Sequence, residues 1–287
     1  MMAGYGDELI RSGLARGAAA RGKRIAFGRK DMKALMWGPH SHEVFKGNPN
    51  VAQPGTEHDA DVEWIEDYKG HRLYCTPGGK GFVWNTSFNP QPGELYFDEI
   101  EKVAGAIHGD GFVVMEPNLP RKIVAPNKEW PRARFEQLAA RLAREVGLRV
   151  VQFRAPLHDQ AYHGGRFIQL GDAVIIPTRS FRDAAAILAH AAVYVGHEGG
   201  MHHCAAAVGV RGVVLMGGFI HPGAVGYRGH VNLTGGSRAC GSIKPCQHCR
   251  EAMDRITVDQ VFDATMGIIN DGRANPLTSN AAARSKP

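Results

Sequence analysis

The chain contains few cysteines and no long hydrophobic run. Five cysteines occur in 287 residues, and an odd number argues against a scaffold held together by disulfides. No run of about 20 apolar residues is present, so the sequence predicts no transmembrane helix. The first residues are polar and glycine-rich and lack the apolar centre of a signal peptide. We therefore expect a cytoplasmic protein without a disulfide framework.

The composition is that of an ordinary globular protein, since 44% of the residues are hydrophobic and 22% are charged. The length predicts two domains of about 100–170 residues each. The formal net charge of +6 suits an anionic partner, such as a sugar nucleotide, a phosphorylated glycan, a membrane surface or a nucleic acid. A basic surface without any such partner explains a charge of this size equally well.

A glycine-rich turn between two apolar strands is the most informative feature of the sequence. Ser180 is suited to cap an amphipathic helix, with Asp183 three residues further on. A buried strand is expected at Val193–Val195, followed by the turn, an alanine-rich helix and a second strand at Gly212–Met216. This order predicts a βαβ unit with the turn at the carboxyl end of a parallel strand, where open α/β sheets bind their ligands.

The residues of the turn indicate what that ligand is. Gly199 and Gly200 allow the backbone to approach a ligand closely, and the helix that follows directs its free N–H groups at an anion. Glu198 and His203 flank the two glycines, and either His202 or His203 is expected to face a phosphate. The turn therefore predicts a phosphorylated, ribose-bearing ligand.

The turn is similar to the donor-binding motif of glycosyltransferase family 9, the lipopolysaccharide heptosyltransferases. Those proteins carry Asp-Thr-Gly-Pro-Met-His before an alanine-rich helix. The six positions here are Glu198, Gly199, Gly200, Met201, His202 and His203. Glu replaces the family's Asp, Gly replaces Thr, and His202 stands where Pro or Ser is usual. The chain therefore resembles a divergent and shortened member of the family.

Two further motifs of the family occur in the same order. The family opens with a glycine-rich turn whose Gly-Asp supplies the catalytic base, and this chain has Gly6-Asp7 before a helical run to Ala20. A basic residue precedes Trp-Pro at a helix start in the family, as Lys128 precedes Trp130-Pro131 here. The loop from Glu116 to Asn127 is longer than usual, so Lys122 competes with Lys128 for this position. The resemblance covers residues 3–28 and 112–260.

The resemblance implies an α/β protein of GT-B type, with two Rossmann-like domains facing a cleft and a reduced N-terminal domain. It implies inverting transfer of a sugar from a nucleoside-diphosphate sugar to a hydroxyl acceptor on a glycan, with Asp7 as the base and no cofactor needed for catalysis. The expected donor-binding residues, which would hold the base, ribose and diphosphate, are Asn118, Lys128, Arg179, Glu198, Gly199, Gly200, Met201, His202 and His203.

Two other functions remain open at this point. One is glycosyl transfer to modified nucleic-acid bases, which the net charge permits. The other is a non-catalytic nucleotide-sugar-binding protein, in which Asp7 only stabilises the start of a helix. Peripheral contact with a membrane is also compatible with the charge, and the sequence does not indicate an oligomeric state.

We expect an acceptor-side domain at residues 1–110, a nucleotide-sugar domain at 111–271 and a flexible tail at 272–287. Strands of the second domain are expected at Phe112–Met115, Arg149–Phe153, Ala173–Ile176, Val193–Val195 and Val213–Met216, with a helix at Arg132–Val146 and a last helix at Thr257–Ile269. Strands of the first domain are expected at Arg24–Phe27, Val62–Tyr68, Leu73–Cys75 and Phe82–Trp84, with a helix at Phe97–Ile107. The aromatic residues of these N-terminal strands are expected in the core.

Three of the cysteines lie close together in the sequence. Cys240, Cys246 and Cys249 could bind a structural zinc or iron ion, with His248 as a candidate fourth ligand. Some relatives in the family carry a cysteine-bound metal in this region, which the spacing resembles. The alternative is that the three are reduced thiols that shape a compact loop. Cys204, in the alanine-rich helix, is expected to be a core residue.

Overall fold

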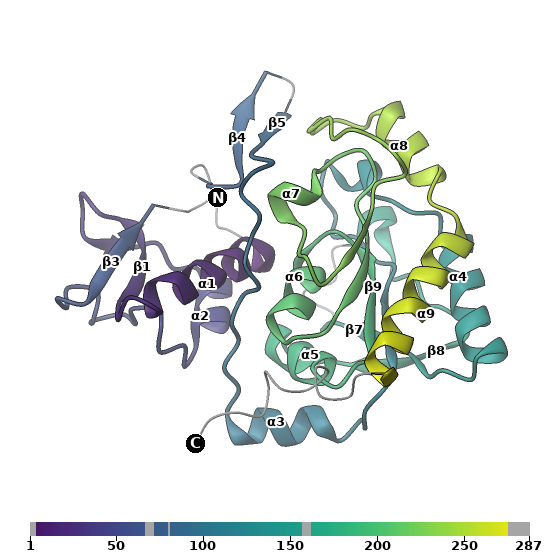
Figure 1. The fold of residues 1–287 in the computed structure, drawn as a ribbon, viewed down its shortest axis with the longest axis horizontal. Coiled ribbons are helices and arrows are strands. Elements are labelled where there is room, and N and C mark those ends of the chain that lie inside the picture. Colours follow the sequence, from purple (N-terminus) through teal and green to yellow (C-terminus); the bar gives the residue numbers. More distant parts are fainter. Residues whose placement is uncertain (1–3, 67–71, 80, 157–161, 275–287) are drawn as a thin grey trace.

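The largest element of the fold is a six-stranded parallel sheet (Figure 1). The computed structural model describes residues 4–66, 72–79, 81–156 and 162–274. The strands of the sheet are β6 (Val113–Glu116), β7 (Val150–Arg154), β8 (Ala173–Pro177), β9 (Val193–His197), β10 (Gly212–Leu215) and β11 (Val231–Leu233). They are ordered β11-β10-β9-β6-β7-β8, with Val113 of β6 opposite both Val150 and Val193. The chain winds outward from β6 in one direction and from β9 in the other, so the topological switch point lies between these two strands.

Helices cover both faces of this sheet because its strands are apolar on both faces. Val114 and Tyr194 pack towards α5 (Phe181–Leu188) and α6 (Gly200–Ala207). Their sequence neighbours Val113 and Val193 pack on the opposite face, towards α4 (Arg132–Ala140) and α9 (Val258–Ala274). Alternate residues of each strand therefore belong to different cores.

The N-terminal part is smaller and contains a three-stranded sheet in the order β2-β1-β3. Its elements are α1 (Tyr5–Ala19), β1 (Arg24–Arg29), β2 (Ala34–Leu35), α2 (Pro39–Phe45) and β3 (Val62–Ile65). β1 and β3 are parallel, and β2 is antiparallel to β1. The chain continues through a hairpin, β4 (Cys75–Gly78) and β5 (Gly81–Trp84), and reaches α3 (Glu99–Ala106) by an extended segment that runs between the two parts (Figure 1).

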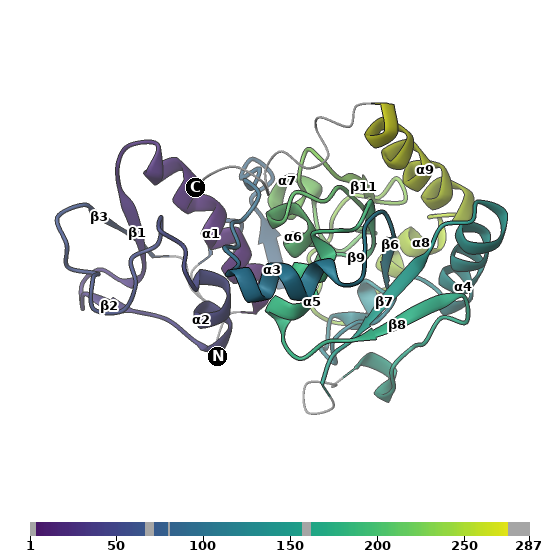
Figure 2. The ribbon, with the colours of Figure 1, turned by 90° about the horizontal axis from the view of Figure 1, so that it is seen from below.

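The two parts share one hydrophobic core. Leu9 and Phe45 of the N-terminal part belong to the same cluster as Ile187 and Cys204 of the large sheet's helices. The buried guanidinium of Arg182 on α5 strengthens this contact, because it donates to both carboxylate oxygens of Glu101 on α3 at 2.6 Å and to the carbonyl of Glu43 on α2 at 2.7 Å. Seen from below, α3 lies along the junction beside α5 (Figure 2).

Short helices complete the described chain. They are the 3-10 turns η1 (Ala125–Asn127) and η4 (His163–Gly165), the π-helix η2 (Arg141–Glu145), and the helices α7 (Pro222–Val225) and α8 (Gln247–Asp254). Within the described residues no helix is both long enough and apolar enough to cross a membrane.

The predicted α/β class is confirmed, and so is the predicted helix cap at Ser180; Thr257 caps the last helix in the same way. Ser180 Oγ accepts from the backbone N–H of Asp183 at 3.1 Å, and Thr257 Oγ1 accepts from the N–H of Gln260 at 3.2 Å. The boundary expected near residue 110 falls between α3 and β6. The division into residues 1–110 and 111–271 stays a prediction, because the core runs through both parts.

Several predicted elements differ from the structure in extent. The strand expected at Leu73–Cys75 lies instead at Cys75–Gly78, where it pairs with β5, and the one expected at Val62–Tyr68 ends at Ile65 among the described residues. The helix expected over 132–146 changes to a π-helix at Arg141 and stops before Gly147, whose φ of +74° favours glycine.

The start of the expected tail is also wrong. The last helix continues to Ala274, so residues 272–274 are helical, and residues 275–287 lie outside the described residues. Burial of Ile268 and Ile269 and an ion pair between Arg211 and Asp271 at 3.0 Å hold this final stretch against the domain.

Candidate active site

The first helix presents a carboxylate on a glycine-rich turn. Asp7 is the third residue of α1, and its Oδ2 accepts from the N–H of Gly4 at 2.9 Å, which completes the start of the helix. Two side chains from beyond β3 also contact it. Arg72 Nε lies 2.9 Å from Oδ1, and the hydroxyl of Tyr74 donates to the same oxygen. Asp7 is therefore held by two donors that lie far from it in the sequence.

These contacts keep Asp7 ionised. Burial alone would raise the pKa of its carboxyl group, but the charge of Arg72 and the hydrogen bond from Tyr74 hold the pKa below its ordinary value. The same desolvation raises the pKa of the Tyr74 hydroxyl, so this phenol stays protonated and remains a donor. Asp7 can accept a proton, and its partners determine how readily it does so.

A second carboxylate lies at the switch point of the large sheet. Glu198 follows β9 directly and is 6% exposed. Lys128, from the loop after the neighbouring strand β6, forms an ion pair with its Oε2. Burial raises the pKa of Glu198, yet the adjacent Lys128 and the hydrogen bond from His203 together hold the pKa well below its ordinary value. The two strands on either side of the switch point thus supply one anion and one cation.

The two histidines after the glycines have different surroundings. His203 is 2% exposed, and its Nε2 lies 3.6 Å from Oε1 of Glu198 while its Nδ1 lies 2.8 Å from the hydroxyl of Tyr227. His202 is fully buried, with Nδ1 at the N–H of Gly199 and Nε2 at the carbonyl oxygen of Val225. Of the two histidines expected to face a phosphate, His202 therefore has both ring nitrogens occupied by backbone groups, and its side chain supports the helix start.

The two glycine-rich helix starts touch each other. A Cβ atom on Gly6 would lie 2.8 Å from Cδ2 of His203, and one on Gly200 would lie 3.4 Å from Cβ of Tyr5. At Gly6 this approach requires the absence of a side chain, whereas a Cβ atom on Gly200 would make an ordinary van der Waals contact. Consequently the N-terminus of α1, with Asp7, lies against the N-terminus of α6, whose first N–H groups have no acceptor within the helix.

Two other predicted donor contacts lie differently. The Asn118 amide is occupied by the backbone of Ile168, donating to its carbonyl at 3.2 Å and accepting from its N–H at 2.7 Å. Arg179 follows β8, which β7 and β6 separate from β9. The carboxyl ends of β8 and β9 are thus about 14 Å apart. The side chain of Arg179 is 82% exposed and forms an ion pair with Asp183. Asn118 therefore shapes the loop, and Arg179 stands at the far end of the same sheet edge.

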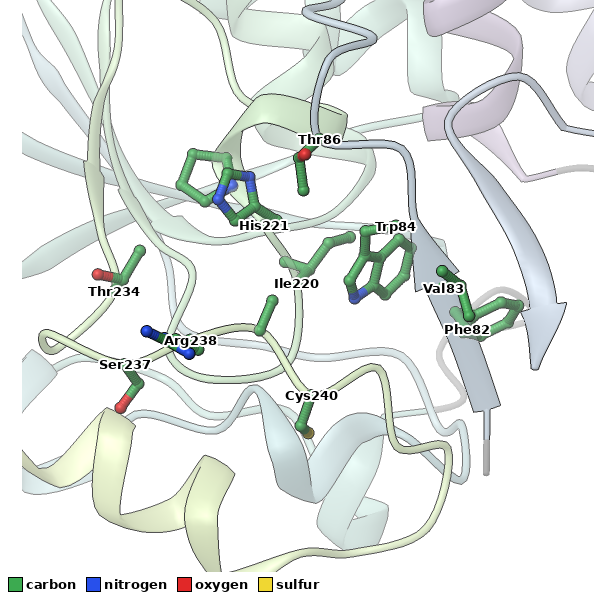
Figure 3. A pocket seen from close by; sticks show the side chains of 12 residues that line it. Phe82, Val83, Trp84, Thr86, Ile220, His221, Thr234, Ser237, Arg238 and Cys240 are labelled. Carbon is green, nitrogen blue, oxygen red and sulfur yellow. The ribbon is translucent and has the colours of Figure 1, made fainter. Parts of the chain in front are cut away.

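A cavity of about 720 Å³ lies beside this site (Figure 3). The hairpin supplies Phe82 and Trp84 to its wall, and the segment after β10 supplies Ile220 and His221. The indole N–H of Trp84 donates to the carbonyl of Phe219 at 2.9 Å, and the ring of Phe219 lies 5.2 Å from Nζ of Lys128. Phe219 thus contacts both Trp84 of the cavity wall and Lys128. Trp84 is half-buried in this wall and packs against the core cluster that contains Phe219 and Ile220, so the expectation of a core position holds in part.

The three cysteines predicted to converge do so. Cys240 Sγ lies 3.2 Å from Sγ of Cys249 and 4.0 Å from that of Cys246, and the three sulfurs lie within 4.8 Å of one another. Backbone N–H groups at the start of α8 outweigh partial burial and lower the pKa of Cys246, whereas burial raises that of Cys249. Tetrahedral coordination with metal–sulfur bonds of about 2.3 Å places sulfurs about 3.8 Å apart, so the spacing suits a metal ion.

His248 is not part of this cluster. Its Nε2 lies 2.8 Å from the carbonyl oxygen of Arg238. Adjacent residues of a helix point about 100° apart, so with Cys249 directed at the sulfurs, His248 faces the neighbouring loop. A second group of candidate ligands, Glu198, His202 and His203, also lies within 4.8 Å. Lys128 is paired with the carboxylate of Glu198, and backbone atoms are bonded to both ring nitrogens of His202. These three residues therefore do not suit a cation.

Several residues near the site were not predicted from the sequence. Arg72 and Tyr74 are 65 and 67 residues from Asp7 and follow no recognisable motif. Removal from solvent raises the pKa of Glu116, at the end of β6, to about 7. Its position at the carboxyl end of a central strand was a signal that could have identified it.

Comparisons with known proteins agree with this geometry. The family model "Glycosyltransferase family 9 (heptosyltransferase)" matches residues 99–257, more than half of the chain. A search of curated proteins found no significant match.

Solved structures with TM-scores above 0.5 share the fold of this chain. The glycosyl transferase family 9 protein from Veillonella parvula DSM 2008 is similar with a TM-score of 0.62 and 13% identity, over 94% of this chain and 95% of that one. The iron-containing dodecameric glycosyltransferase TibC from enterotoxigenic E. coli H10407 has a TM-score of 0.58 and 14% identity, over 96% and 75%. E. coli ADP-heptose lps heptosyltransferase II has a TM-score of 0.44 and 17% identity, over 68% of this chain and 56% of that one.

The predicted GT-B-like fold with a reduced N-terminal part is therefore confirmed. The family match covers the sheet, the switch point and the turn at Glu198. The chain belongs to glycosyltransferase family 9.

Proposed function

We propose that this glycosyltransferase moves a sugar from a nucleoside-diphosphate sugar to a hydroxyl group of a glycan, with inversion at the anomeric carbon. The observation that carries the proposal is the contact between the start of α1, with Asp7, and the start of α6 at the switch point. One helix start offers a base and the other an anion site beside Lys128, which are the two groups that a single displacement needs. Residues 1–110 then form the acceptor side and 111–271 the donor side.

The donor would lie across the carboxyl ends of the large sheet. Its diphosphate meets the N–H groups of Gly200 and Met201 and the ammonium of Lys128, since helix starts and cations stabilise the same charge. Its ribose and base extend over β6 and β7 towards Arg179. Glu198 and His203 act on this anion site indirectly, because they orient Lys128 and the glycine turn.

The reaction is then one displacement. The acceptor oxygen attacks the anomeric carbon while its proton passes to a carboxylate oxygen of Asp7, and the bond between that carbon and the phosphate oxygen breaks. The electron pair leaves with the nucleoside diphosphate, whose added charge Lys128 and the N-terminus of α6 stabilise. Attack opposite to the departing group inverts the configuration. No cofactor takes part in this step.

The acceptor would reach Asp7 beside the hairpin. Tyr74 and Arg72 occupy the carboxylate in this structure, so an acceptor hydroxyl exchanges with one of these donors. Arg238 in the wall of the adjacent cavity has no ion-pair partner among the described residues, and the lining contains no carboxylate. Together with the ring of Trp84, this cationic side chain suits a sugar that carries a negative group, and so favours an anionic glycan as acceptor.

We also propose that the cysteine cluster binds one structural zinc or iron ion. The neighbour TibC is described as iron-containing, and the three sulfurs of this chain have a spacing that suits thiolate coordination. Such an ion would supply folding energy by linking the segment before α8 to the helix itself.

A screen of nucleotide sugars by thermal unfolding tests the proposed function. A ligand present at about 100 times its dissociation constant stabilises the folded state by about 2.7 kcal/mol. We expect a shift from one class of nucleoside-diphosphate sugar and from its diphosphate, and none from the free sugar. If no nucleotide sugar changes the midpoint, the donor assignment is wrong.

A further inference from the structure

The cysteine loop, residues 240–249, is fastened to the segment that carries Lys128. Asn127 is fully buried and precedes Lys128 directly. Its side-chain amide donates to the carbonyl oxygens of Ser242 and Lys244 at 2.7 and 2.8 Å and accepts from the N–H of Cys246 at 2.9 Å. One side chain thus satisfies three backbone groups of the cysteine loop.

A second connection joins the same loop to Lys128 from another side. The N–H of Cys240 donates to the carbonyl of Gly218 at 2.9 Å, and that of Gly241 donates to Phe219 at 3.0 Å. The ring of Phe219 lies 5.2 Å from Nζ of Lys128. Phe219, which the cysteine loop holds, therefore lies on one side of the Lys128 ammonium. The backbone of Lys128 follows Asn127, which is bonded to the same loop.

The position of Lys128 depends on these contacts because its backbone lies in a loop, outside any strand or α-helix. It ends the 3-10 turn at Ala125–Asn127 and lies in the long loop between β6 and α4. Its side chain is 15% exposed, and among the described residues its ammonium has one ion pair, with Glu198. A catalytic cation must be held in place before the reaction to be effective. On its C-terminal side the segment is tied to β9, where the N–H of Trp130 donates to Nε2 of His197 at 2.9 Å, and on its N-terminal side Asn127 ties it to the cysteine loop.

We propose that Asn127 is a positioning residue that couples the cysteine loop to Lys128, so that the loop's three thiols set the affinity for the nucleoside diphosphate. This inference rests on the proposed function, in which Lys128 contacts the diphosphate. When the thiols hold a metal ion, the loop is rigid and Asn127 fixes Lys128 beside Glu198. When they do not, the loop loosens and Lys128 loses its orientation, although no residue of the donor site has changed.

A double-mutant cycle measured by calorimetry tests this coupling. The probe is whichever of ADP, GDP, UDP and CDP binds the wild type most tightly. Asn127→Asp keeps the size of the side chain and the acceptor for Cys246 but loses both amide donors, so we expect its affinity for the diphosphate to fall about tenfold. In a Lys128→Met background the same change should have little effect, because the residue through which Asn127 acts is gone.

Cys249→Ser should behave in the same way as Asn127→Asp, with loss of affinity in the wild-type background and little further loss beside Lys128→Met. The control is Asn48→Asp, a buried asparagine of the N-terminal part that bonds to the N–H of Asn50. It should lower the unfolding midpoint without changing the affinity.

Three outcomes are distinct. If no nucleoside diphosphate binds the wild type, the proposed function fails, and the coupling fails with it. If a diphosphate binds and Asn127→Asp leaves its affinity unchanged, only the coupling is overturned. If the effects of Asn127→Asp and Lys128→Met add fully, Asn127 supports the fold in general and not Lys128, which also overturns it.

Discussion

Gly6 and His203 lie in direct contact, so that a Cβ atom on Gly6 would stand 2.8 Å from Cδ2 of the imidazole. Gly6 belongs to the first turn of α1, which presents Asp7, and His203 belongs to the first turn of α6, which follows β9. The contact is one of those that join the N-terminal part to the part with the large sheet. Because Gly6 has no Cβ atom, Asp7 and the N-terminus of α6 can lie this close to each other.

Gly6→Ala should therefore displace the two helix starts. Overpacking of this kind costs about 1–3 kcal/mol of folding free energy, and we expect turnover to fall more steeply than stability because the reacting groups separate. The control is Gly17→Ala on the same helix, where the added Cβ meets no atom closer than 4.0 Å. That change should raise stability by about 0.5–1 kcal/mol. Urea unfolding and an assay of sugar transfer on both variants compare the two positions, and equal behaviour would contradict the contact.

Tyr74→Phe should shift the acid side of the pH profile. The hydroxyl of Tyr74 lowers the pKa of Asp7, so its removal raises that pKa. The base then becomes protonated at a higher pH, and the acid limb of kcat/KM moves upwards. Tyr96→Phe is the matched control, because Tyr96 bonds to Asn50 away from the site. A limb that stays in place, or that moves downwards, would show that Tyr74 does not act on the base.

Lys128→Met should reverse the pH dependence contributed by Glu198. In the wild type the pKa of folded Glu198 is lowered, so its ionisation stabilises the protein above the unfolded pKa of about 4.3 and this stability is lost at lower pH. Without Lys128, burial raises the folded pKa, and stability then falls as the pH rises through it. Breaking a buried pair costs about 3–5 kcal/mol near neutral pH.

The double variant Lys128→Met/Glu198→Gln tests the cause of that loss. Because it removes the charge left behind, it should recover most of the stability at pH 7. Urea unfolding from pH 4 to pH 8 measures all three proteins. An equal loss at every pH, or no recovery in the double variant, would mean that Glu198 is not held in its ionised form by Lys128.

The cysteine cluster gives a prediction about metal content. Protein purified without added metal should contain about one zinc or iron ion per chain, and Cys249→Ser should lower both this content and the unfolding midpoint, since metal binding contributes to folding. Cys204→Ala is the control, because Cys204 is buried in α6 away from the cluster. Elemental analysis near zero, with Cys240 and Cys246 reacting freely with a thiol reagent in the native state, would leave only a thiol loop.

Local patterns predicted the parts of the site that are formed by neighbours in sequence. The turn at Glu198–His203 and the turn at Gly6-Asp7 each combine glycine, a carboxylate and a helix start within a few residues. The partners of Asp7 could not be found in this way, because Arg72 and Tyr74 are brought to it by the return of the chain after β3. The amide of Asn127 likewise bonds to a residue 119 positions away, and no periodic pattern in the sequence indicates such a contact.

The direction of individual side chains was also beyond the sequence. His202 and His203 are adjacent at the start of α6, and an imidazole at either position suits a phosphate site. In the structure His202 completes the helix start, and His203 approaches Glu198. Asn118 has the composition of a ligand-binding residue but bonds to Ile168 across the loop. The packing between helices and strands decides in which direction such a side chain points, and the local sequence does not show this packing.

The central claim is that Asp7 is the base of a glycosyl transfer, and Asp7→Asn tests it most directly. Asn keeps the shape of the side chain and one acceptor oxygen, but its NH2 group cannot accept the proton. With the donor identified by thermal unfolding, we expect transfer to fall about 10²- to 10⁴-fold while calorimetry shows donor affinity within a factor of about three of the wild type. If Asp7→Asn transfers sugar at the wild-type rate, Asp7 only caps the first helix and the proposed mechanism is wrong.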